Sequence, residues 1–270
     1  MRSALIVARS VLIEAIRRKE IYVIVMLAVL VILLTGSIRI FNLEGTTKFY
    51  REVSLQIMNL AVALTVIVLA ARQLPREFEA RTIYPLLAKP IGRSTFLAGK
   101  FLGVLFAGLF CYGVFILLFL GGMFYLEASL SWPLFAQAVY LQVLAIAVTA
   151  SLAFVLSLVF NVDTAIAVSI LLFGLSSAMG QAVDFIHDAV APIGVFRIGS
   201  WVGSAGDLFM RVLLYGVPQL SLFDLTKKLV HEGTWGPVEG WVILQLTLYA
   251  AVYLSLFLGI SYLLFRRRPL

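Results

Sequence analysis

Charge is scarce in this 270-residue chain, in which Asp, Glu, Lys and Arg make up 13% of the residues and hydrophobic residues 62%. A soluble domain carries about 25% charged and about 45–50% apolar residues. Fourteen acidic and 21 basic residues cannot cover a water-soluble globule of this size, and disorder needs the opposite composition. With a mean hydropathy of +1.03, the composition excludes both classes and indicates a membrane protein.

Residues that hold metals or form disulfides are also scarce. The single cysteine, Cys111, excludes an intrachain disulfide and a cysteine-based metal cluster, and the two histidines, His187 and His231, lie far apart. The sequence has no HExxH helix, no GxSxG elbow and no phosphate-binding loop. We therefore expect no catalytic site, metal or cofactor on this chain, and we interpret the pair His187-Asp188 as a solvated turn rather than a proton relay.

Long uncharged runs, by contrast, are abundant. A membrane-spanning helix needs about 20 mostly apolar residues, and six runs meet that length. They predict an all-α integral membrane protein with a single domain over residues 1–270. The predicted spans are residues 21–38, 53–71, 101–126, 135–160, 164–183 and 240–265. A seventh span over residues 189–206 is the alternative, but Arg197 lies in its middle.

The basic residues predict the orientation of these spans. With six spans both termini share a side, and that side has 14 of the 21 basic and 5 of the 14 acidic residues, a net charge of +9. The other side carries −2. By the positive-inside rule both termini are cytoplasmic, and the net charge of +7 is explained by the membrane and indicates no nucleic-acid partner.

Two segments outside the spans have predicted places at the membrane surface. Residues 1–20 predict an amphipathic helix on the cytoplasmic face, with Ser10 and Arg17 on its polar stripe and Val11 on its apolar one. A plain basic flank is the alternative. The long external segment, residues 184–239, contains an apolar run at 212–223 that is too short to span, so we expect an interfacial or re-entrant helix there.

The spans hold neutral polar residues but no charged residue near their middle, which disfavours an ion-coupled carrier. The neutral groups either line a pathway or form hydrogen bonds between helices. The candidate lining residues are Gln56, Asn59, Thr65, Gln142 and Thr149. Small residues at Gly99, Gly103 and Ala107 recur every four positions in span three, a spacing that lets a neighbouring backbone approach closely.

The loop between spans two and three, residues 73–96, is the most specific segment of the chain. Pro75 suits a first helical position, and Glu77 and Arg81 form an i,i+4 pair in the favourable order. Pro85 ends or kinks this helix near Tyr84. The pattern predicts a short charged helix on the cytoplasmic surface that receives force from a soluble partner. An ordinary charged loop is the alternative.

This loop resembles the signature of the ABC-2 type permeases, the membrane subunits of a class of bacterial ABC exporters. The matching elements are Glu77, Glu79, Arg81-Thr82-Ile83, Leu86-Leu87, Lys89-Pro90-Ile91-Gly92-Arg93 and Gly99-Lys100. A second patch, residues 217–225, is similar to the Leu-Pro-Asn and Phe-Asp pattern that precedes the last helix in those permeases, with Gln219 in place of the usual Asn. The family includes permeases for copper-site maturation and gliding motility, and the substrate does not carry over.

The resemblance implies a permease that forms its pathway as a dimer in the bacterial inner membrane, driven by a separate ATPase subunit that holds ATP and Mg. A periplasmic accessory protein is a further implied partner. The residues implied to contact the ATPase are Arg76, Glu77, Phe78, Glu79, Arg81, Thr82, Tyr84, Lys89, Pro90, Arg93 and Lys100. The alternative is a membrane scaffold or assembly factor that transports nothing and binds a soluble partner through the same loop.

Overall fold

The computed structural model describes residues 8–11, 13, 19–37, 43–75, 92–190, 218–231 and 236–267. Within these ranges the chain forms helices, turns and irregular backbone, with no strand. The main helices are α2 (Lys19–Ser37), α3 (Leu43–Gln73), α6 (Arg93–Tyr125), α7 (Trp132–Val159), α8 (Val162–Val190) and α11 (Gly240–Arg267). Two short elements, the 3₁₀ turn η2 (Leu220–Phe223) and α10 (Thr226–Val230), lie between α8 and α11.

Four of these helices, α3, α6, α7 and α11, are long and apolar enough to cross a membrane. The predicted second and sixth spans lie within α3 and α11, and the predicted third and fourth spans extend one residue past the ends of α6 and α7. The predicted first and fifth spans fall on α2 and α8, whose apolar stretches in the described part of the chain, Ile24–Thr35 and Val162–Ser176, are shorter. The all-helical membrane architecture is thus confirmed, and the count of six spans stays a prediction.

Several helices extend beyond the predicted spans. α3 begins at Leu43 rather than at residue 53, α6 begins at Arg93 rather than at residue 101, and α8 continues to Val190 rather than ending at residue 183. Hydropathy identifies only the apolar stretch that lies in the hydrocarbon core. The helix itself continues through polar residues wherever the backbone hydrogen bonds between residues i and i+4 continue. The predicted boundaries were therefore too short at these ends.

The expected helix over residues 212–223 is wrong in the part that the structure describes. Pro218 and Gln219 lie outside any helix, and the backbone turns only briefly through η2 before α10 begins. Proline supplies no backbone N–H, which favours an irregular approach to this turn. Residues 212–217 lie outside the described ranges.

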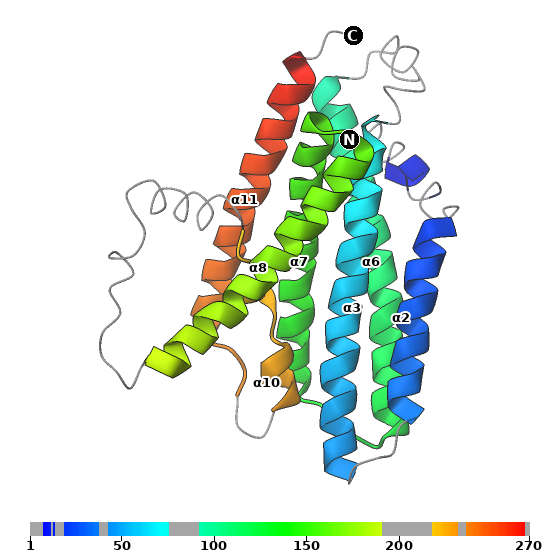
Figure 1. Cartoon of the computed structure of the whole chain (residues 1–270), viewed down its shortest axis with the longest axis vertical. Helices are drawn as coiled ribbons and strands as arrows, with labels where there is room; N and C mark the ends of the chain where they lie inside the picture. The colour runs from blue at the N-terminus through cyan, green and yellow to red at the C-terminus, as the bar shows by residue number, and fades with distance from the viewer. Residues whose placement is uncertain are drawn as a thin grey trace.

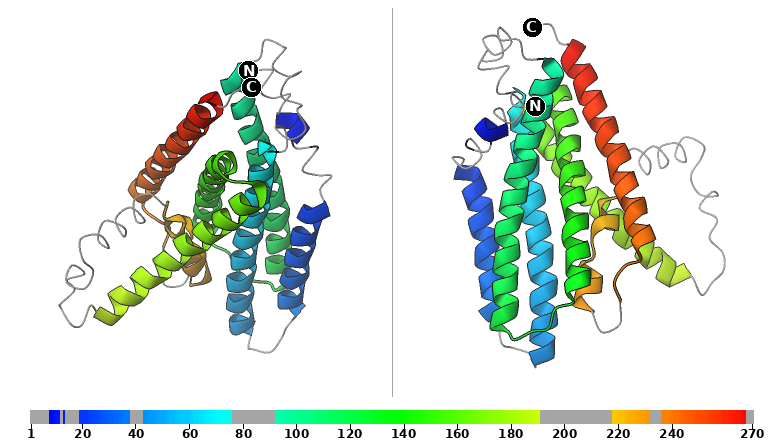
Figure 2. Two further views of the ribbon diagram at one scale, coloured as in Figure 1. Left: turned by 45° about the horizontal axis from the view of Figure 1, so that its top comes forward. Right: turned by 180° about the vertical axis from the view of Figure 1, so that it is seen from behind.

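The helices form a bundle with α3 and α7 at its centre (Figure 1). α3 packs against α2, α6 and α7, and α11 packs mainly along α7. α8 crosses the bundle obliquely, and its C-terminal part extends away from the other helices in both views of Figure 2. We refer to the two ends of the bundle as the Arg93 end, where α6 begins and α11 stops, and the Tyr125 end, where α6 stops and α7 begins.

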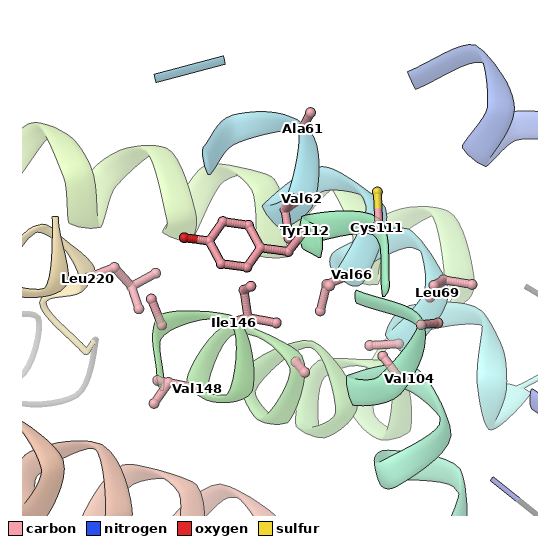
Figure 3. Packing of buried hydrophobic residues seen from close by; sticks show 14 of the residues in the cluster. Ala61, Val62, Val66, Leu69, Val104, Cys111, Tyr112, Ile146, Val148 and Leu220 are labelled. Carbon is pink, nitrogen blue, oxygen red and sulfur yellow. The ribbon is translucent and has the colours of Figure 1, made fainter. Parts of the chain in front are cut away.

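Close packing between the central helices depends on small side chains. A Cβ added to Gly108 of α6 would lie 2.5 Å from Cγ2 of Val66 on α3 and 3.4 Å from Cγ2 of Ile146 on α7. Figure 3 shows Val66 and Ile146 in this apolar interior, where Val66 is fully buried and Ile146 is 2% exposed. The absence of a side chain at Gly108 therefore sets how closely the three helices approach.

The small residue Gly103 brings the N-terminal segment against α6. A Cβ added there would lie 2.5 Å from Cβ of Val11 and 2.9 Å from the carbonyl oxygen of Ala8. Residues 8–11 and 13 are helical, with Val11 buried and Ser10 exposed, whereas Ile13 is 42% exposed. The close approach expected at the small residues thus occurs at Gly103. The helix over residues 1–20 as a membrane-surface element stays a prediction.

Candidate coupling and pathway site

The two helices that flank the predicted coupling loop are joined by a buried polar contact at the Arg93 end. Nζ of Lys100, on α6, donates a hydrogen bond to Oε1 of Gln73, the last residue of α3, at 3.2 Å. Lys100 is 5% exposed and Gln73 is 2% exposed. Nζ also lies 5.8 Å from the centre of the Phe96 ring, a cation–π distance. A buried ammonium group is costly without a polar partner, and Gln73 supplies one from the neighbouring helix. The hydrogen bond therefore holds the end of α3 against α6.

Arg93 makes a second connection, between α6 and α11. Its Nη1 donates to the main-chain carbonyl oxygen of Arg266 at 2.9 Å. Next to it, the rings of Phe96 and Phe265 stack with their centres 6.0 Å apart and an angle of 22° between their planes. Both of the predicted coupling residues that the structure describes, Arg93 and Lys100, are therefore bonded to helices adjacent to α6.

The remaining predicted coupling residues lie outside the described ranges, because the structure describes nothing between Pro75 and Gly92. They are Arg76, Glu77, Phe78, Glu79, Arg81, Thr82, Tyr84, Lys89 and Pro90. What the structure does place is the pair of helix ends that this loop connects, the last turn of α3 and the first turns of α6.

Two of the five candidate pathway residues line a common pocket. Asn59 of α3 and Gln142 of α7 lie around a partly enclosed space of about 280 Å³, counting the open space at its mouth. Tyr112 of α6, Asp224 from the segment before α10, and Thr226 of α10 complete its polar lining. Figure 3 shows the Tyr112 side chain between the helices with its hydroxyl directed toward Leu220. Amide, phenol and carboxylate groups here provide both donors and acceptors, and the enclosed part of the space is about the size of one water molecule.

The other three candidates have different surroundings. The Thr65 hydroxyl donates to the carbonyl oxygen of Ala61, and the Thr149 hydroxyl to that of Ala145, each at 2.8 Å within its own helix. Both threonines are buried. Gln56 is exposed on α3. Threonine commonly satisfies its hydroxyl in this way inside an apolar helix. The Thr65 hydroxyl also has a side-chain hydrogen bond with the Cys111 thiol of the neighbouring helix α6.

Several polar contacts that the sequence did not indicate hold the segment before α11 onto the bundle. Ser176 of α8 donates to the carbonyl oxygen of Pro218 at 2.7 Å and accepts from the backbone N–H of Leu220 at 2.6 Å. The Tyr249 hydroxyl of α11 accepts from the N–H of Gln219 at 2.9 Å. Ser176 was visible in the sequence as a neutral polar residue inside a span, but its partners were not.

Two further residues add to this attachment at the Tyr125 end. Arg51, 6% exposed, donates to the carbonyl oxygen of Leu229 at 3.3 Å and to that of Ser129. The Gln137 amide exchanges two hydrogen bonds with the backbone of Val238, at 3.0 and 2.8 Å. The sequence did contain a signal for Arg51, which is a cation two residues before the predicted start of span two. Because α3 begins at Leu43, ahead of the apolar stretch, Arg51 lies within the helix and is buried.

A bundle of long apolar helices, in which most of the buried polar residues described bond within the protein, defines an integral membrane protein. A family model described as "ABC-2 family transporter protein" matches residues 5–270, which is nearly the whole chain. The chain belongs to this family and is a membrane permease of the ABC-2 type. Permeases of this family generally work with an ATPase subunit. A search of curated proteins found no match.

Proposed function

We propose that this permease is the membrane subunit of an ATP-driven ABC-2 exporter that forms its translocation pathway as a dimer and is coupled to a separate ATPase subunit. Family membership supports the permease and its need for an ATPase. The loop between α3 and α6, together with the first turns of α6, carries the residues that resemble the family's signature, Glu77 to Lys100. ATP and Mg belong to the ATPase, and this chain contributes no catalytic group, metal or cofactor. The scaffold alternative has no observation in its favour.

The observation that carries the coupling proposal is the hydrogen bond between Lys100 and Gln73. The bond lies at the base of the loop and joins the last residue of α3 to α6. A force applied to the loop therefore moves both helices together rather than bending the loop against one of them. α3 also contacts α7, so this displacement reaches the helices that line the Asn59–Gln142 pocket.

The finer assignments follow the charge distribution. We place the Arg93 end on the cytoplasmic side of the bacterial inner membrane, since the predicted cytoplasmic segments carry most of the basic residues. The segment between α8 and α11 then faces the periplasm, where an accessory protein has access to it. Asn59 and Gln142 are the neutral groups that we assign to the pathway.

The experiment is to co-express the permease with the ATPase encoded next to it and to compare two kinds of variant. Glu77→Ala combined with Arg81→Ala removes an i,i+4 charge pair from the loop and should lower ATPase co-purification by about tenfold or more, the effect of losing about 1.4 kcal/mol of binding free energy. Lys100→Met should leave the ATPase bound but reduce the stimulation of its ATP hydrolysis by the permease in proteoliposomes.

The matched control is Lys48→Ala combined with Glu52→Ala, an exposed i,i+4 pair near the opposite end of α3. This control should change neither co-purification nor ATP hydrolysis. Unchanged association in the Glu77/Arg81 variant would refute the role of the loop, and a wild-type permease that retains no ATPase at all would favour the scaffold alternative.

A further inference from the structure

Three arginines from distant parts of the chain meet at the Arg93 end, between α6 and α11. The hydrogen bond from Arg93 to the Arg266 carbonyl oxygen fixes the Arg93 side chain against the last turn of α11. That turn carries Arg266 and Arg267, both exposed. The buried, stacked rings of Phe96 and Phe265 support the junction from the interior. The place of the Arg93 side chain at the end of α11 is thus determined by a hydrogen bond and by ring packing, and not only by the sequence of each helix end.

These arginines have no acidic partner within the described part of the chain. The only polar contact of the Arg93 guanidinium there is the Arg266 carbonyl oxygen, and no carboxylate pairs with Arg266 or Arg267. The carbonyl groups at the C-terminus of α11 offset part of the positive charge through the helix dipole. Three guanidinium groups at one junction still leave an excess of positive charge, which favours an anion nearby.

The apolar surface next to these arginines has the geometry of a lipid contact. Leu256, Ile260 and Leu263 are 48%, 37% and 55% exposed, and with Arg267 they follow the 4, 3, 4 spacing of one helical stripe. α11 is the least buried of the four long apolar helices: 22% of its most apolar stretch is buried inside the bundle, against 44–67% for the other three. From Leu256 to Arg267 the helix rises about 16 Å, which matches one leaflet of a hydrocarbon core about 30 Å thick.

We propose that this junction binds an anionic phospholipid, with the phosphate at Arg93 and Arg267 and one acyl chain along the Leu256–Leu263 stripe of α11. Guanidinium groups bind phosphate oxygens in a bidentate manner, and basic pockets between transmembrane helices hold anionic headgroups. A zwitterionic lipid brings its own cation to a junction where the described residues offer no carboxylate to receive it. The lipid would join the ends of α6 and α11 at the membrane surface. The proposal concerns the permease alone and does not depend on the ATPase.

The experiment is native mass spectrometry of the full-length permease in detergent, titrated with phosphatidylglycerol or with phosphatidylcholine of the same acyl chains. We expect the wild type to retain phosphatidylglycerol in preference. Each arginine near a membrane surface changes the affinity for anionic lipid by about fivefold, so Arg93→Gln combined with Arg267→Gln should weaken retention by about 30-fold. Arg93→Lys combined with Arg267→Lys keeps the charge and should give a smaller loss, because the bidentate contact is removed.

The control is Lys48→Gln combined with Lys227→Gln, which removes the same net charge at exposed positions toward the other end of the bundle and should leave retention nearly unchanged. Equal binding of the two lipids, or undiminished phosphatidylglycerol binding in the glutamine variant, would overturn the proposal. Displacement of the lipid by millimolar inorganic phosphate would show a free-anion site instead. Loss of ATPase binding in the glutamine variant, with lipid retention unchanged, would assign the arginines to the protein partner.

Discussion

At the scale of single residues, Gly121 and Gly122 are neighbours on α6 with opposite surroundings. A Cβ on Gly122 would lie 1.9 Å from Oη and 2.3 Å from Cζ of Tyr50, whereas a Cβ on Gly121 would meet nothing within 4 Å. The Tyr50 ring is buried and stacks on Phe119 at 6.0 Å, and its hydroxyl donates to the Phe119 carbonyl oxygen at 3.3 Å. Gly122 therefore provides the space that this ring occupies between α3 and α6.

The residue-scale prediction is that Gly122→Ala destabilises the permease by about 1–3 kcal/mol, the usual cost of an overpacked interior. Gly121→Ala should be neutral or stabilising by up to about 1 kcal/mol, because alanine favours a helix over glycine and the site is open. Thermal unfolding of the two variants in the same detergent compares them. Equal melting temperatures of the two variants would mean that Tyr50 does not occupy this position. In a Tyr50→Ala background, Gly122→Ala should lower the melting temperature much less, because the ring that it clashes with is gone.

At the scale of elements, the segment that holds η2 and α10 is attached to the bundle by specific polar contacts. Ser176 acts as acceptor for Leu220 and as donor to Pro218, so one hydroxyl satisfies two backbone groups of this segment. Asp224 then accepts from the backbone N–H and the hydroxyl of Thr226, at 2.9 and 2.5 Å, at the start of α10. The attachment therefore depends on a few side chains rather than on continuous secondary structure.

The element-scale prediction concerns Ser176→Ala, which leaves the Pro218 carbonyl and the Leu220 N–H without this hydroxyl. We expect the backbone amides of residues 219–225 to exchange about fivefold to 30-fold faster, corresponding to a loss of about 1–2 kcal/mol. Hydrogen–deuterium exchange measured by mass spectrometry detects this. Ser169→Ala is the matched control, since Ser169 is equally buried on α8 but bonds the Ala165 carbonyl oxygen of its own helix. Similar exchange in both variants would contradict the attachment.

At the scale of the whole molecule, polar contacts join the helices at both ends of the bundle. The Arg93 end has the contacts of Lys100 with Gln73 and of Arg93 with Arg266. The Tyr125 end has those of Arg51 and Gln137 with backbone carbonyls. The apolar interior between them contains small and aliphatic side chains, as Figure 3 shows around Val66 and Ile146. This distribution suits a protein whose middle lies in lipid and whose ends meet water and headgroups.

The whole-molecule prediction is the membrane orientation, tested by single-cysteine labelling in a Cys111→Ser background, which removes the sole cysteine. Ser94→Cys lies exposed at the Arg93 end and Glu239→Cys lies exposed at the other end. A membrane-impermeant maleimide should label the position 239 cysteine in intact spheroplasts and the position 94 cysteine only after lysis. The reverse pattern would contradict the assignment of the Arg93 end to the cytoplasm.

The sequence by itself determined the solvent of this protein and the positions of its long helices. Uncharged runs of about 20 residues have few alternatives to a membrane helix, because an unpaired backbone group in lipid is too costly. The helix ends were predicted less well: α3 and α6 extend through polar residues that a hydropathy argument leaves out, such as Lys48 and Arg93. The family resemblance also came from the sequence, since it depends on a local motif that the chain carries in one loop.

Only the tertiary structure decided which polar groups meet. Lys100 and Gln73 lie 27 positions apart, Ser176 and Pro218 42 positions apart, and Arg93 and Arg266 173 positions apart. A sequence shows that a polar residue lies inside an apolar run, and physics then requires a partner for it, but many partners satisfy that requirement equally. The packing of α3, α6, α7, α8 and α11 selects the partners of each polar group, and so determines which helices are held together at each end of the bundle.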